Sequence, residues 1–112
     1  MKPAKWILIF VIFILLGNQL FSSTISGRIT FKNGTAIPNL KVICETVYFT
    51  HVSRTDNGGN YQFIVENREE TVFYLFIVLP KGKREKIGQV IGMGTNHTID
   101  VRLTINSFSE IE

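Results

Sequence analysis

The chain has 112 residues, the size of a single domain, and its formal net charge is +3, from twelve Lys and Arg against nine Asp and Glu. Without Lys2 and Lys5, which belong to an N-terminal leader, the charge falls to about +1 (10 basic against 9 acidic), too small to indicate nucleic-acid binding. The remaining residues, about ninety, can bury one modest core.

Residues 1–23 have the pattern of a secretory signal-peptide helix. Lys2 and Lys5 precede an apolar run over residues 6–16, and the small residues Ser22 and Ser23 follow, near which we expect cleavage. The run is shorter than the roughly 20 apolar residues that span a bilayer as helix. We therefore expect a protein that is secreted, periplasmic or at the cell surface. The alternative is an uncleaved membrane anchor formed by residues 6–21.

The first two segments after the leader alternate apolar and polar residues, as half-buried strands do. Residues 25–31 place Ile25, Gly27 and Ile29 on one face. An Asn-Gly turn follows, and residues 40–45 then place Leu40, Val42 and Cys44 on one face. Cys44 is the only cysteine, so no internal disulfide can form. Its register favours a buried apolar side chain over a reactive thiol or an intermolecular disulfide.

Two histidines fall in strand and loop patterns that suggest no metal site. Residues 46–54 are β-branched and aromatic, which predicts a strand with His51 in its middle, and His97 follows a Gly-rich loop. Neither histidine has a Cys or carboxylate cluster nearby in sequence, so we expect both to be solvent-facing or hydrogen-bonded, with no metal or cofactor.

A polar turn over residues 55–60 leads into a strand that places Tyr61, Phe63 and Val65 on one face. Asp56 begins a run that resembles the start of a calcium loop, but the later oxygen ligands are missing. A turn role for these residues is therefore expected.

Residues 71–79 are apolar on both faces, which predicts a central strand with one face in the core and another that needs cover. We take Phe73, Leu75 and Ile77 as the candidate interaction face.

The remaining segments form a basic hairpin tip, two strands and a tail. Residues 80–86 could attract phosphate or polysaccharide carboxylates, although a solvated turn with charges that protect a sticky strand is favoured. Residues 87–93 and 99–105 are expected as strands, and residues 107–112 as a frayed tail.

No recognisable catalytic, nucleotide-binding or zinc-binding motif occurs, so we expect no enzyme activity and no cofactor. Asn33 and Asn96 begin Asn-x-Thr sequons, which would accept glycans if a eukaryote secreted the chain.

Three motifs together resemble the carboxypeptidase regulatory-like domain. They are Ser-Gly-Arg-Ile at residues 26–29, Gly-Thr-Ala-Ile-Pro-Asn-Leu-Lys-Val at 34–42, and Thr-Asp-x-x-Gly-x-Tyr-x-Phe at 55–63. The order of Ile37 and Pro38 is swapped relative to the family pattern, and Asn39 stands where the family prefers glycine. The resemblance implies a prealbumin-like (transthyretin-like) β-sandwich with purely structural roles for six motif residues: Gly27, Thr55, Asp56, Gly59, Tyr61 and Phe63.

We therefore predict an all-β, antiparallel Greek-key β-sandwich of about seven strands over residues 24–106. The expected function is that of an exported, non-catalytic structural or binding module with an unknown protein or carbohydrate partner. It would contact a membrane only if the leader is retained. The alternative is a transthyretin-like small-ligand carrier or hydrolase, which would need His51, Arg54 and His97 to converge in a pocket.

Overall fold

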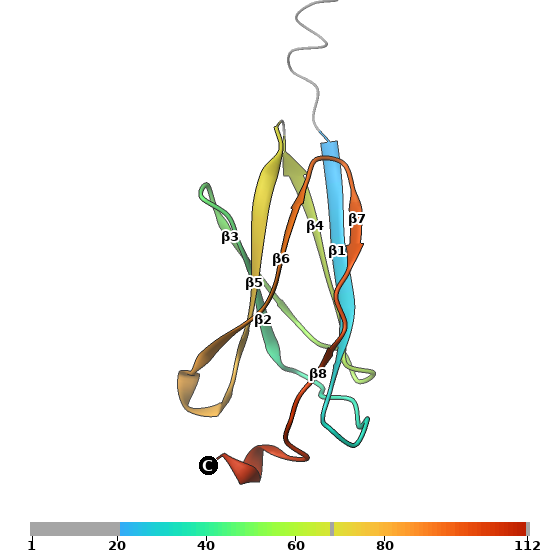
Figure 1. Cartoon of the computed structure of the whole chain (residues 1–112), viewed down its shortest axis with the longest axis vertical. Helices are drawn as coiled ribbons and strands as arrows, with labels where there is room; N and C mark the ends of the chain where they lie inside the picture. Colours follow the sequence, from blue (N-terminus) through green and yellow to red (C-terminus); the bar gives the residue numbers. More distant parts are fainter. Residues whose placement is uncertain (1–20, 68, 112) are drawn as a thin grey trace, which may run out of the picture.

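The protein folds as an all-β sandwich, as predicted. The computed structural model describes residues 21–67 and 69–111, so the predicted leader helix lies outside the described residues, as does the rest of residues 1–20. Two four-stranded sheets face each other (Figure 1). Their strands are β1 (Phe21–Thr30), β2 (Lys41–Glu45), β3 (Thr50–Arg54), β4 (Asn60–Asn67), β5 (Thr71–Val78), β6 (Arg84–Gly92), β7 (Asn96–Thr98) and β8 (Val101–Arg102).

The strand order is β4-β1-β7 in one sheet, with β8 also pairing with β1, and β3-β2-β5-β6 in the other. The second sheet is antiparallel throughout, whereas β1 pairs antiparallel with β4 but parallel with β7 and β8. The predicted strand over residues 99–105 is reduced to β8, and β7, which contains His97, lies where a loop was predicted. The count is eight strands in the described residues instead of about seven.

Strand β1 begins inside the predicted leader. Phe21 already pairs with Asn67, so this strand includes three residues before the predicted boundary at residue 24. Ser23 is fully buried, and its hydroxyl accepts a hydrogen bond from the Gly94 N–H at 2.9 Å and contacts Asn67 Oδ1 at 3.4 Å. The sequence pattern could not distinguish the two roles of Ser22 and Ser23, because serine is compatible both with a signal-peptide cleavage site and with a strand.

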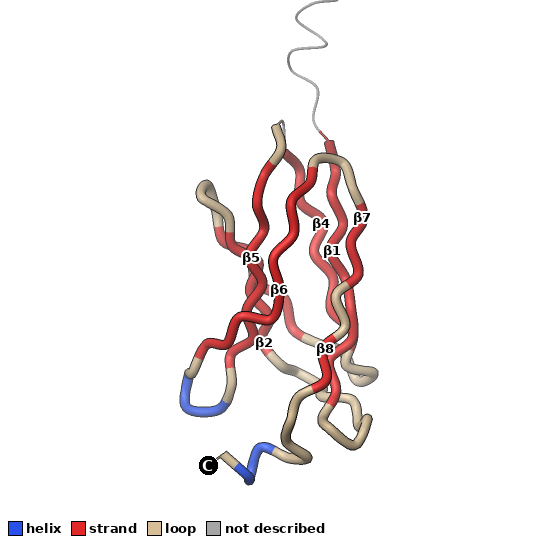
Figure 2. The backbone as a smooth tube through the Cα atoms, in the orientation of Figure 1, coloured by secondary structure: helices blue, strands red, loops and turns tan. Residues whose placement is uncertain are grey.

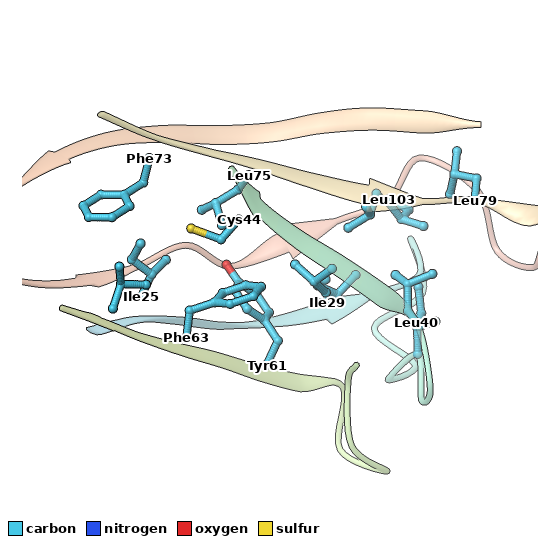
Figure 3. Close-up of a cluster of buried hydrophobic side chains, with 14 residues drawn as sticks. Ile25, Ile29, Leu40, Cys44, Tyr61, Phe63, Phe73, Leu75, Leu79 and Leu103 are labelled. Carbon is cyan, nitrogen blue, oxygen red and sulfur yellow. The ribbon is translucent and has the colours of Figure 1, made fainter. Parts of the chain in front are cut away.

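The core lies between the sheets and contains the side chains that alternation placed inward (Figure 3). Tyr61, Phe63 and Val65 are 3%, 5% and 1% exposed, which confirms the predicted inward face of β4. The centre of the core is completed by inward residues of β1, β2 and β5: Ile25, Ile29, Val42, Cys44, Phe73, Leu75 and Ile77. The apolar area removed from water here is the main source of stability.

The candidate interaction face on β5 was assigned to the wrong side of the strand. Phe73, Leu75 and Ile77 are all fully buried in the core, so they offer no surface to a partner. The cross-strand register explains this, because Leu75 pairs with Cys44 and Ile77 with Val42, which both point inward. The alternate residues of β5, which pairing directs outward, are Val72, Tyr74, Phe76 and Val78.

The start of β3 and the C-terminal tail also differ from expectation. Strand β3 begins only at Thr50, because the Thr46 N–H donates to the Phe49 carbonyl and closes a turn. The tail predicted to fray forms a 3₁₀ turn, η2 (Phe108–Glu110), with a capping box between Ser107 and Glu110. A second such turn, η1 (Pro80–Gly82), connects β5 to β6, and both are blue in Figure 2.

Candidate binding surfaces

A groove opens at the end of the sandwich between the β5–β6 hairpin and the chain that follows β8. The β5–β6 ladder has a bulge between Leu75 and Phe76, and beyond it the hairpin tip turns away from β8 (Figure 1). The space left has a volume of about 510 Å³. We call it the basic groove, and its lining residues are Leu79, Pro80, Lys81, Lys83, Glu85, Lys86, Ile87, Val101, Arg102, Leu103, Thr104, Ile105 and Ile111.

The basic groove combines an apolar floor with a cationic rim. Leu79 and Leu103 are 8% and 9% exposed and belong to the core cluster, so the floor is continuous with the protein interior. Lys81, Lys83 and Arg102 are exposed around it. The tip is fixed by hydrogen bonds from the Leu79 N–H to the Lys83 carbonyl and from the Gly82 N–H to the Leu79 carbonyl.

The outward side of the β3-β2-β5-β6 sheet carries a continuous apolar surface. Across the strands, Val52 pairs with Ile43, Ile43 with Phe76, and Val72 with Ile91. Directly paired residues share a face, so these side chains lie together. We call this surface the outer apolar face, and it consists of Ile43, Val52, Val72, Tyr74, Phe76, Val78 and Ile91.

Cations cover part of the outer apolar face. The Arg84 guanidinium lies 4.2 Å from the centroid of the Phe76 ring and forms a 3.2 Å ion pair with Glu45. The Lys86 ammonium lies 5.1 Å from the centroid of the Tyr74 ring. Both arrangements are cation–π contacts, which anchor the long side chains over the rings.

A third, polar depression lies beside β1, β3 and β4 and includes Arg28, Arg54, Asp56 and Asp100. Its charged groups are already engaged within the protein. The Arg28 guanidinium donates to the Gly58 carbonyl at 2.9 Å, and the Arg28 N–H donates to Asp100 Oδ1 at 2.9 Å. Arg54 donates to the Asn39 carbonyl at 3.2 Å. These contacts hold loops in place.

Thr55 joins two separate parts of the chain. Its hydroxyl donates to the Ile37 carbonyl at 2.6 Å and accepts from the Leu40 N–H at 2.8 Å. Asn39 between these residues has a φ of +55°, a conformation that asparagine tolerates well. The buried threonine therefore fixes the entry to β2.

Asp56 organises the turn that leads into β4. Its Oδ1 accepts hydrogen bonds from the N–H groups of Gly58 and Asn60, both at 2.9 Å. The hydrogen bonds from Asn60 and Gly58 lower the pKa of Asp56 below its usual range, although partial desolvation opposes them. Gly59 has a φ of +79°, and a Cβ there would lie 2.5 Å from the Ile29 carbonyl oxygen. Both residues thus act on the backbone of the turn.

Gly27 and Tyr61 meet at the Ile99 carbonyl. The Tyr61 hydroxyl donates to this oxygen at 2.7 Å, and burial together with the carboxylate of Asp100 raises the Tyr61 pKa. A Cβ on Gly27 would overlap the same carbonyl oxygen. The six motif residues, including the buried Phe63, thus all have contacts that maintain the fold.

The two histidines lie in different sheets. His51 is exposed on β3 and packs against the Phe49 ring, with 4.6 Å between centroids. His97 on β7 contacts the Thr95 hydroxyl at 2.9 Å. Neither histidine lines the basic groove or the polar depression, whereas Arg54 lines the latter. Among the described residues, no group of three or more His, Cys, Asp or Glu is placed to hold a metal ion.

Cys44 is a free thiol, fully buried in the core. Burial raises its pKa to about 11, because the thiolate would lose its hydration. The structure thus gives it the buried apolar role that the register favoured.

Asn33 and Asn96 of the two sequons are both exposed, the first in a turn and the second in β7. In residues 21–67 and 69–111, no helix has the length and apolar character needed to cross a bilayer.

Sequence reasoning did not find the basic groove or the outer apolar face. The groove lies beside the bulge at Ile87, which leaves no clear mark in the sequence. The cluster of cations over residues 81–86 was the one available signal. For the outer face, the signal was the double apolar period of β5, which does not indicate which side is inward.

Comparison with known proteins identifies a structural relative but no family. No family model matches the chain, and no curated protein matches it. Among solved structures, it resembles a DUF3823 family protein from Parabacteroides merdae ATCC 43184, with a TM-score of 0.51 and 12% sequence identity. The match covers 76% of this chain and 47% of the other, so the present chain spans about half of that protein's length. At this identity the similarity concerns the fold alone.

Proposed function

We propose that this protein is an exported, non-catalytic β-sandwich module that captures another protein through its outer apolar face. The single observation that carries the proposal is that this face joins apolar side chains of all four strands of one sheet. Val52 and Ile91, toward its two sides, are 54% and 53% exposed. Contiguous apolar surface of this kind is typical of protein interaction sites.

The outer apolar face is separate from the core. Ile43 is 7% exposed, yet it is not among the residues of the core cluster. The outward residues of β5 also do not pack against that cluster. The outward side of the sheet therefore has its own apolar surface, which a partner could bury without disturbing the sandwich.

The charges beside this face indicate the chemistry of the partner. Arg84 and Lys86 lie over its aromatic rings, and Lys41 pairs with Arg54 at the neighbouring end of β2 and β3. Glu45 neutralises only part of this charge, through Arg84. A protein surface with an apolar centre and carboxylates around it would complement this arrangement.

Membership of the carboxypeptidase regulatory-like group is part of the proposal and rests on the three sequence motifs. The structural contacts of Gly27, Thr55, Asp56, Gly59, Tyr61 and Phe63 support it, since the resemblance implies such roles. They also favour a non-catalytic module, because the polar motif residues are occupied by backbone hydrogen bonds.

The test compares two surface variants of the full-length chain in a host that exports it. The double variant Val52→Lys, Ile91→Lys changes the outer apolar face, and Ile64→Lys is the control, because Ile64 is 63% exposed on β4 in the other sheet. A photoreactive amino acid at position 52 should crosslink to a partner protein, and one at position 64 should not. Pull-downs should lose that partner with the double variant alone.

Equal recovery of the same partner by all three proteins would reject the outer apolar face as the binding site. Circular dichroism of each variant shows whether it is folded. Cell fractionation and the intact mass of the recovered protein test export separately, so a cytoplasmic protein with a retained leader would reject that part of the proposal.

A further inference from the structure

We propose that the basic groove is a second binding site, for a small amphiphilic carboxylate whose apolar body lies on the groove floor. The proposal does not depend on the protein-binding face, because no residue of the outer apolar face lines the groove. Lys86 lies beside both sites, and the groove does not need its charge. It concerns the end of the sandwich that the bulge in the β5–β6 ladder opens.

The volume and the floor of the groove suit an organic ligand. About 510 Å³ lies within the range of roughly 300–1,000 Å³ of small-molecule sites. Leu79 and Leu103 present the edge of the core, and Ile87 and Ile105 pack against the same core from the two sides. Ile111 is 42% exposed at the C-terminal side. An apolar body placed here would cover surface that water now contacts.

The rim defines the charge of the ligand. Four lining residues are cationic, and Glu85 is the one carboxylate among the lining residues. The ammonium of Lys86 already bonds to Gln89 Oε1 at 2.7 Å and lies over Tyr74, so it is partly occupied. Lys81, Lys83 and Arg102 remain as exposed cations on both sides of the floor. An anionic head group with an aliphatic or aryl body complements both features.

The backbone of the hairpin tip, which carries Lys81 and Lys83, is fixed. Lys81 and Gly82 have φ values of +70° and +80°, and the Leu79–Lys83 hydrogen bond closes the turn around them. A site with cations on a closed turn loses less conformational freedom when a ligand binds than one on a loose loop.

Calorimetric titration of the full-length chain with decanoate, octanoate and uncharged decanol tests the proposal. Residues 1–20 are the same in every protein compared, so they contribute equally. We expect decanoate to bind, with affinity that falls about three- to fourfold for each methylene removed. Affinity should also fall as salt is raised, because the cations of the rim are exposed. Decanol should bind more weakly.

Two changes at the groove should weaken decanoate binding in different ways. Lys83→Glu with Arg102→Glu should lower the affinity for decanoate about tenfold or more. The same variant should bind the cationic decyltrimethylammonium more tightly than the unchanged protein does. Ile111→Asp should lower the affinity for decanoate and decanol alike. The control, Lys41→Glu with Arg54→Glu, makes the same change in net charge on the outer sheet and should leave decanoate affinity within twofold.

Three results would overturn the proposal: no heat of binding with millimolar decanoate, affinity unchanged in both groove variants, or equal loss in the control. Binding only by an acidic, apolar peptide would reject the small-ligand class. A dimer in sedimentation that Ile111→Asp dissociates would assign the groove to a second copy of this chain instead.

Discussion

At the scale of single residues, the Ile99 carbonyl is the point where β1, β4 and the β7–β8 link meet. Gly27 leaves the space that this carbonyl occupies, and the Tyr61 hydroxyl supplies its hydrogen bond. The two motif residues lie directly opposite each other in the β1–β4 ladder. The two residues together hold the β7–β8 link beside β1 and β4.

Substitution of Gly27 by alanine should be strongly destabilising. The new Cβ overlaps backbone, which cannot move without separating β7 from β1, so we expect the free energy of unfolding to fall by about 3 kcal/mol or more. Gly82→Ala is the control, since φ there is +80° but a Cβ would meet no atom within 4 Å. It should cost only about 1–2 kcal/mol. Urea unfolding measures both, and equal losses would contradict the role of Gly27.

The Cys44 thiol should be unreactive in the folded protein. It is fully buried and its pKa is raised to about 11, so an alkylating reagent at pH 8 should label it only after denaturation. Rapid labelling of folded protein would show that the core opens around β2.

The same thiol makes stability depend on alkaline pH. The unfolded thiol ionises near its ordinary pKa of 9.0, whereas the folded thiol keeps its proton up to about 11. The folded state therefore holds more protons between these values, and stability falls as pH rises through that interval, by up to about 2–3 kcal/mol. Urea unfolding of the protein and of Cys44→Ala between pH 8 and 11 measures this. In Cys44→Ala, the stability should still fall with rising pH, but less steeply, because the pKa of Tyr61 is also raised.

At the scale of elements, β1 depends on its first three residues. Phe21 lies against Gly94, and Ser23 contacts both Gly94 and Asn67. Asn67 in turn donates to the carbonyls of Glu69 and Gly92. The start of β1 therefore connects β4 with the β6–β7 link.

A chain that begins at Thr24 should be less stable than one that begins at Phe21. The shorter chain loses three ladder pairs and the buried Ser23 hydroxyl, and we expect a loss of about 2–4 kcal/mol. Thermal and urea unfolding of both proteins, beside the full-length chain, provide the measurement. Equal stability would restore the predicted boundary after residue 23. The expected result would instead place any cleavage that preserves the fold before Phe21.

Sequence alternation predicted most of the inward faces because one side of β1, β2 and β4 is mostly polar. It could not orient β5, because both sides of that strand are apolar and the alternation does not show which side faces the core. Pairing of Ile77 with Val42 decides its orientation, and such long-range register is not visible in a single segment. The strand predicted over residues 99–105 was too long because apolar and polar residues alternate throughout it, although only Val101–Arg102 form a ladder. Strand β7 was missed because Asn96–Thr98 are all polar.

The candidate surfaces were less predictable than the strands. The basic groove combines hairpin residues 79–87 with residues 101–111, which lie at least fourteen positions later (101 − 87), so its apolar floor and its cations are united only in the fold. Phe108, in the tail predicted to fray, packs edge-on against Phe31 with 5.0 Å between ring centroids. Nothing local in the sequence relates these two rings.

At the scale of the whole molecule, the two sheets should unfold together, because they share one core. Leu75→Ala should lower the free energy of unfolding by about 2–5 kcal/mol, since Leu75 is fully buried. Ile64→Ala, at an exposed position on β4, should change it by less than about 0.5 kcal/mol. Tyrosine fluorescence and far-ultraviolet circular dichroism should report one shared transition in urea. Two separate transitions would show that each sheet is stable alone.

The parallel pairs of β1 with β7 and β8 have a consequence for the order of events during biosynthesis. Thr24 pairs with Asn96 and Ile29 with Val101, some seventy residues downstream. The Lys32 N–H donates to the Ile105 carbonyl. Residues 96–105 must therefore have left the ribosome before β1 and Lys32 can gain all of these partners.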